Sequence, residues 1–123
     1  MTAYLGVALA SAIGAPARYL LDRLVMSRTG GAFPWGTLAI NVTGSFVLGL
    51  LGGLAAHHGL PKTALAILGT GFCGAYTTFS TFSVDTIRLL ESGALRKATA
   101  NVAVSLTAGL LSAAAGLGLA LIL

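Results

Sequence analysis

Long apolar stretches alternate with short polar ones along the chain, and this pattern predicts helices that cross a membrane. A helix needs about 20 mostly apolar residues to cross the hydrocarbon of a bilayer. The apolar stretches reach that length, and most charged residues lie between them. We therefore predict a single transmembrane domain over residues 1–123, with four spans at about 2–21, 34–56, 63–90 and 98–123.

Each predicted span is apolar on most sides and carries one stripe of small or polar residues. Small residues at every fourth position let helix backbones approach closely, and polar ones bond between helices. We expect the stripes to face one another, within one subunit or across a dimer. In the second span the stripe consists of Thr37, Asn41, Ser45, Gly49 and Gly53.

The third span is interrupted near its middle by residues 71–82 (GFCGAYTTFSTF). Two glycines three apart weaken a helix, and two adjacent threonines can bond their own backbone instead of continuing it. Irregular backbone survives in a bilayer only where protein or a polar cavity surrounds it. We predict a broken helix. The carbonyls freed around Gly74 and Thr77 would either coordinate an alkali cation or leave a kink that the threonine hydroxyls satisfy.

Composition supports an integral membrane protein, because the chain is 56% hydrophobic and only 8% charged, against about 25% charged in a soluble domain. The basic residues are scattered over loops, which argues against nucleic acid as a partner. Arg18 near the end of the first span, with no basic segment before it, argues against a cleavable signal peptide. The adjacent His57 and His58 have no acidic or cysteine partner and do not predict a metal site.

The polar groups within the spans suit a small anion. No carboxylate, lysine or histidine lies in the middle of a span, which excludes the usual proton relays and metal ligands. Hydroxyl and amide hydrogens are donors, and a phenyl ring has a positive edge. Such groups replace part of a hydration shell without a full charge that would trap the ion. The predicted path consists of Thr37, Asn41, Phe79, Ser80, Thr81, Phe82, Asn101 and Ser105.

Several of these residues have a second interpretation. Asn41 could form an ordinary bond between helices. Phe79 and Phe82, three residues apart on one helix face, could be core packing. Arg18 either extends to the lipid headgroups or attracts anions to the vestibule of a pore, with Asp22 one turn away as a partial neutraliser.

Three segments resemble the CrcB/Fluc family of fluoride ion channels: residues 14–19 (GAPARY), 36–46 (GTLAINVTGSF) and 71–83 (GFCGAYTTFSTFS). The resemblance implies an all-α membrane protein, an antiparallel dimer of four-helix subunits with two fluoride pores. It implies pore residues at Phe79, Phe82 and Asn41, and a hydroxyl track at Ser105. It also implies a structural sodium ion at the dimer centre, held by carbonyls of both subunits. Here these fall on Gly74 and Thr77. The chain departs from the family pattern at Ala10, Ser11, Ala75, Asp85 and Asn101.

The function implied is passive fluoride efflux, with no enzymatic step. The chain has no phosphate-binding G-x-x-x-x-G-K-[ST] motif. A small multidrug transporter would need a carboxylate in the first span, which has none. An intramembrane serine hydrolase would need Ser45 or Ser80 beside a buried histidine, but both histidines lie in a loop. A purely structural membrane subunit remains an alternative.

Charge placement predicts the orientation in the cell membrane. Six of the seven Lys and Arg residues lie on the side of the loops at 22–34 and 91–97, and only Lys62 lies on the other side. The positive-inside rule puts those loops in the cytoplasm and both termini outside. A subunit that inserts both ways should have balanced loops. We therefore expect an oppositely oriented paralogue as partner, and the alternative is a dual-topology homodimer.

Overall fold

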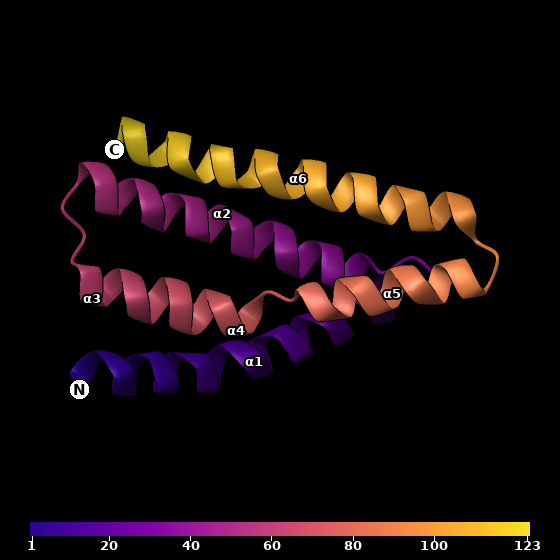
Figure 1. Ribbon diagram of the computed structural model, residues 1–123, viewed down its shortest axis with the longest axis horizontal. Helices are drawn as coiled ribbons and strands as arrows, with labels where there is room; N and C mark the ends of the chain where they lie inside the picture. Colours follow the sequence, from indigo (N-terminus) through magenta and orange to yellow (C-terminus); the bar gives the residue numbers. More distant parts are fainter.

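The computed structural model describes residues 1–123 as helices joined by short connections, drawn in Figure 1. Three helices are long and apolar enough to cross a membrane, namely α1 (Thr2–Thr29), α2 (Trp35–His57) and α6 (Leu95–Ile122). Between α2 and α6 runs a bent helical segment made of α3 (Lys62–Leu65), η1 (Ala66–Cys73), α4 (Gly74–Tyr76) and α5 (Phe79–Glu91). The all-α membrane fold with a bent helix is thus confirmed, whereas the fourth crossing and the dimer stay predictions.

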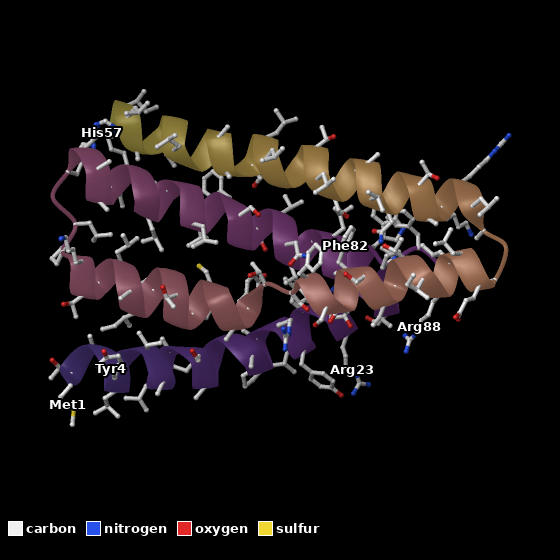
Figure 2. The ribbon with its side chains drawn as sticks, viewed as in Figure 1. Met1, Tyr4, Arg23, His57, Phe82 and Arg88 are labelled. Atoms are coloured by element: carbon white, nitrogen blue, oxygen red, sulfur yellow. The ribbon has the colours of Figure 1, made fainter.

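The chain reverses direction at each connection, so that the N- and C-termini lie at the same end of the bundle (Figure 1). Arg23 and Arg88 lie near the opposite end, away from Met1, Tyr4 and His57 (Figure 2). α1 continues past the predicted end of its span, and residues 22–29 extend the helix toward the basic end. Apart from Lys62 at the other end and Arg18 in α1, the lysine and arginine residues therefore lie toward one end, as their positions in the sequence led us to expect.

α2 and α6 pack closely because glycines allow backbone contact between them. A side chain at Gly49 would collide with the carbonyl of Ala113, and one at Gly116 would collide with the carbonyl of Phe46. The hydroxyl of Ser112 donates to the carbonyl of Val42 at 2.6 Å. The small residues Gly49 and Gly116 thus face the other helix within one subunit.

α1 packs on η1 and α4 in a similar way. Gly14 lies against the carbonyl of Phe72, and Gly71 lies against the backbone of Val7. The hydroxyl of Ser11 donates to the Gly71 carbonyl at 3.1 Å. These contacts fix the first half of the bent segment on α1, directly before the point where it breaks.

The first half of the bent segment contains an unpredicted π-helix, η1. A π-helix bonds each N–H to the carbonyl five residues earlier, and such turns are rare and are often found at functional sites. At its end, the N–H of Gly74 donates to the carbonyl of Gly69. The wide turn leads directly into α4 and the break.

Candidate functional site

The helix breaks at Thr77 and Thr78, inside the segment where the sequence predicted it. Both residues are extended, with φ/ψ of −78°/160° and −150°/124°. α4 therefore ends at Tyr76, and α5 begins at Phe79. The hydroxyl oxygen of Thr78 accepts the N–H of Thr81 at 3.1 Å and so caps the start of α5.

The break leaves several carbonyls without their helical partners, and those of Gly74 and Thr77 are among them. In a continuous helix, the carbonyl of Gly74 would accept the N–H of Thr78, four residues on. That N–H instead donates to Oδ1 of Asn41 at 2.9 Å. The carbonyl of Thr77 likewise loses the N–H of Thr81, which bonds to the Thr78 hydroxyl.

A threonine hydroxyl bonds to backbone at the kink, as one of the two interpretations expected, and the cation site stays a prediction. The hydroxyl of Thr77 donates to the carbonyl of Cys73 at 2.8 Å, which also accepts the N–H of Thr77 at 2.9 Å. That bond does not reach the carbonyls of Gly74 and Thr77. Half-buried Arg18 donates to the Thr77 carbonyl at 3.4 Å, so its guanidinium lies at the break.

Asn41 joins α2 to the break through two hydrogen bonds. Its Nδ2 donates to the carbonyl of Thr78 at 2.8 Å, and its Oδ1 accepts the N–H of the same residue. The bond between helices considered for Asn41 is therefore present. It is made to backbone, and Asn41 also lines the cavity described next.

A cavity of about 370 Å³ lies beside the break, between α2, α5 and α6. Phe82, which lines it, lies midway along the bundle (Figure 2). None of the lining residues is charged. Hydroxyl and amide donors are distributed over an apolar wall, which suits a small ion that must be bound and released. The lining consists of Asn41, Ser45, Leu48, Thr77, Thr78, Phe79, Phe82, Ser105, Leu106, Gly109, Leu110 and Ala113.

Four of the predicted path residues meet in this cavity: Asn41, Phe79, Phe82 and Ser105. The two rings lie with their centroids 5.6 Å apart and their planes tilted by 47°. Phe79 is 76% exposed, so core packing within this subunit does not account for its position. Phe82 is half-buried.

Thr37 and Thr81 line a second cavity, of about 490 Å³, nearer the basic end. Asp22, Asp85 and Arg88 also line it. The hydroxyl of Thr37 donates to a carboxylate oxygen of Asp85 at 3.0 Å, so its hydrogen is already used. This cavity holds charges of both signs, unlike the one at the break.

Asn101 and Ser80 line neither of these cavities. Asn101 is only 1% exposed, and its Nδ2 donates to the hydroxyl of Thr86 at 3.0 Å. Its Oδ1 accepts the hydroxyl of Ser105 at 3.4 Å. Ser80 is exposed at the start of α5, with its hydroxyl 3.3 Å from that of Thr78. Sequence spacing placed these residues on the correct helices but not in the cavity at the break.

Three polar lining residues were not among the predicted path residues: Thr77, which was predicted as a cation ligand instead, Ser45 and Thr78. Ser45 lies one turn beyond Asn41 on the same stripe of α2, so its spacing could have identified it. Thr78 lies within the segment that predicted the break. Its role as cap and as the partner of Asn41 depends on tertiary contacts that spacing does not reveal.

Comparison with known proteins finds similarity over nearly the whole chain. The sequence pattern of the family described as CrcB-like protein, Camphor Resistance (CrcB), matches residues 5–117. A relative in Streptomyces avermitilis named fluoride-specific ion channel FluC 1 is 56% identical over 85% of this chain and 84% of its own. A relative in Frankia casuarinae with the same name is 48% identical over 89% of both chains.

A third relative, fluoride-specific ion channel FluC 2 of Mycobacterium tuberculosis, is 48% identical over 92% of this chain and 86% of its own. Identity at this level over this length is far above what shared composition of membrane helices would give. The chain belongs to the CrcB-like protein family, whose members are ion channels and not enzymes.

Proposed function

We propose that this chain is a subunit of a fluoride-selective channel that gives passive efflux of fluoride. The observation that carries the proposal is the uncharged cavity at the helix break, where the amide of Asn41, the hydroxyl of Ser105 and the ring of Phe82 meet. The names of the three relatives support fluoride as the permeant ion.

These groups match the chemistry of fluoride. The ion is small and strongly hydrated, so a pore must replace much of its water with closely placed hydrogens. N–H and O–H groups do this, and the positive edges of phenyl rings add a weaker attraction. Because no residue of the cavity carries a full charge, the ion can leave again, as conduction requires.

Passive efflux suffices to lower cytoplasmic fluoride. Neutral HF enters cells from acid surroundings and dissociates inside, where the anion is trapped. A channel lets the anion leave, driven by the inside-negative membrane potential. Cells with such a channel resist fluoride without spending ATP on its export.

The proposed assembly is an antiparallel dimer in the cell membrane. The exposed ring of Phe79 at the edge of the cavity supports it, because a large apolar ring there would gain a protein neighbour from a second subunit. With the basic end in the cytoplasm and both termini outside, the partner is a paralogue of opposite orientation or a second copy of this chain.

A structural sodium ion would suit two of the carbonyls freed at the break, those of Gly74 and Thr77. Unwound backbone carbonyls are the ligands that membrane transporters use for alkali cations. Gly74 and Thr77 would each supply one oxygen, and the same residues of a second copy would supply two more. The ion would neutralise carbonyl dipoles at the break. Arg18, which bonds to the Thr77 carbonyl, would have to release it.

The test is fluoride efflux from proteoliposomes, with a fluoride electrode and valinomycin to balance charge. We expect efflux that is fast compared with protein-free vesicles, little chloride efflux, and lower fluoride efflux when sodium is replaced by a large organic cation. The chain is tested alone and together with an oppositely oriented paralogue. If fluoride efflux equals that of protein-free vesicles in both cases, the proposed channel function is wrong. If efflux does not depend on sodium, only the proposed sodium site is wrong.

A further inference from the structure

We propose that Asn41 is a positioning residue for the helix break, and that it acts on conduction through the backbone of Thr78. This inference rests on the proposed function and deepens it, because it assigns to Asn41 a task beyond contact with the ion. It begins from the two hydrogen bonds between the side chain of Asn41 and the backbone of Thr78.

The carboxamide of Asn41 pairs with Thr78 as the peptide group of a neighbouring strand would. It donates to the carbonyl at 2.8 Å and accepts from the N–H at 2.9 Å. Thr78 is extended and only 8% exposed, so its backbone groups have no helical partner and depend on the side chain of Asn41. An unpaired backbone group in hydrocarbon is costly. Without Asn41, both backbone groups of Thr78 would lose the partner that they have in this structure.

The bond to the N–H of Thr78 also decides what happens to the carbonyl of Gly74. This N–H is the group that would satisfy the carbonyl in a continuous helix. By holding it, Asn41 leaves the Gly74 carbonyl free. Asn41 therefore keeps the Gly74 carbonyl, one of the two on which the proposed cation site depends, available to a cation.

Thr78 in turn sets where α5 begins. Its hydroxyl caps the helix at the N–H of Thr81, and Phe79 follows it directly. A change in the backbone of Thr78 would therefore move Phe79 and, one turn later, Phe82. The orientation of both rings at the cavity depends on a bond made from α2.

The bonding capacity of the side chain explains why asparagine suits this position. A carboxamide has one oxygen and two N–H donors. One donor and the oxygen hold Thr78, which leaves one N–H for an ion in the cavity that Asn41 lines. A carboxylate at this position would repel the Thr78 carbonyl, and a single hydroxyl cannot span both backbone groups.

The experiment measures hydrogen exchange at the amide of Thr78, in the reconstituted protein and without fluoride. In Asn41→Ala we expect this amide to exchange about tenfold faster or more, because its acceptor is gone. The matched control is Ser45→Ala, one turn along α2 in the same cavity, whose hydroxyl forms no bond to Thr78. There we expect exchange at the parental rate. Parental protection in Asn41→Ala would overturn the proposal.

A second variant serves if removal of the side chain prevents assembly. In Asn41→Asp, only the protonated acid can both donate to the Thr78 carbonyl and accept its N–H. Protection at Thr78, corrected for intrinsic exchange, should then rise as the pH falls. In Ser45→Asp it should not depend on pH. Equal pH dependence in the two variants would contradict the positioning role. Exchange is measured without fluoride. A parent protein that conducts no fluoride would therefore overturn the proposed function, but the exchange rates would still test the role of Asn41.

Discussion

Phe79 and Phe82 stand three residues apart on α5, yet their surroundings differ. Both line the cavity at the break, but Phe79 is 76% exposed whereas Phe82 is half-buried. A phenyl ring attracts an anion only through its edge. Because Phe82 is held by its own subunit beside Asn41 and Ser105, we expect its ring to matter most for conduction.

Replacement of Phe82 by isoleucine tests this at a single residue. Phe82→Ile keeps an apolar side chain but removes the ring edge, so fluoride efflux from proteoliposomes should fall to the level of protein-free vesicles. Size-exclusion chromatography should show unchanged assembly. Phe33→Ile is the control, because Phe33 packs on Trp35 outside both cavities, and it should conduct normally. Unchanged efflux in Phe82→Ile would remove the ring from the mechanism.

Four of the eight predicted path residues line the cavity at the break, and the other four do not. Asn41 and Thr37 lie on one stripe of α2, and helical spacing predicts that they face the same way. In the structure both bond to the bent segment, Asn41 to the backbone of Thr78 at the break and Thr37 to the carboxylate of Asp85 on α5. Asn101 is buried and donates to the hydroxyl of Thr86. Such outcomes depend on where a neighbouring backbone lies, which spacing along one helix cannot give.

At the scale of elements, residue spacing predicted close packing between helices, and α2 and α6 show such packing. Glycine and serine at every fourth position predict close approach, and Gly49 and Gly116 each touch a carbonyl of the other helix. The π-helix η1 was not foreseen. Its residues, which include Gly69 and Gly71, have no pattern specific to a π-helix, and contacts with α1, such as the bond from Ser11 to Gly71, accompany its wider turn.

A valine at Gly49 tests the packing of these two helices. Gly49→Val would force its side chain into the carbonyl of Ala113, and overpacking of this kind costs about 1–3 kcal/mol. We expect a lower temperature for loss of monodisperse protein in detergent. Gly52→Val, on the same helix with open space around its position, is the matched control and should match the parent. Equal stability of the two variants would contradict direct backbone contact.

At the scale of the whole molecule, the break explains why only three helices are long enough to cross a membrane by themselves. The segment from Lys62 to Glu91 is divided at Thr77 and Thr78, and α5 has only 13 residues. Both termini nevertheless lie at one end (Figure 1), as they would if this segment crossed the bilayer as well. Length and hydropathy sufficed to predict the reversals of the chain. They do not test the proposed second subunit, because its contacts would lie outside this chain.

The uneven charge of the two ends leads to a prediction about partners. Expressed alone in fluoride-sensitive cells, this chain should insert with one orientation and give little resistance. Co-expression with an oppositely oriented paralogue should restore growth in fluoride. A reporter fused to the C-terminus should be found outside the cytoplasm. Full resistance from the chain alone would support a dual-topology homodimer instead.

The π-helix has a consequence for insertions and deletions in this protein. A π turn holds about one residue more than an α turn. Deletion of one residue from Ala66–Cys73 can therefore be absorbed as that stretch tightens into an α-helix, with little displacement of Gly74. The same deletion in α5 would rotate every later residue by about 100° around the helix axis. Within the bent segment, deletion of one residue is thus better tolerated just before the break than after it, because it leaves the aromatic residues facing the cavity.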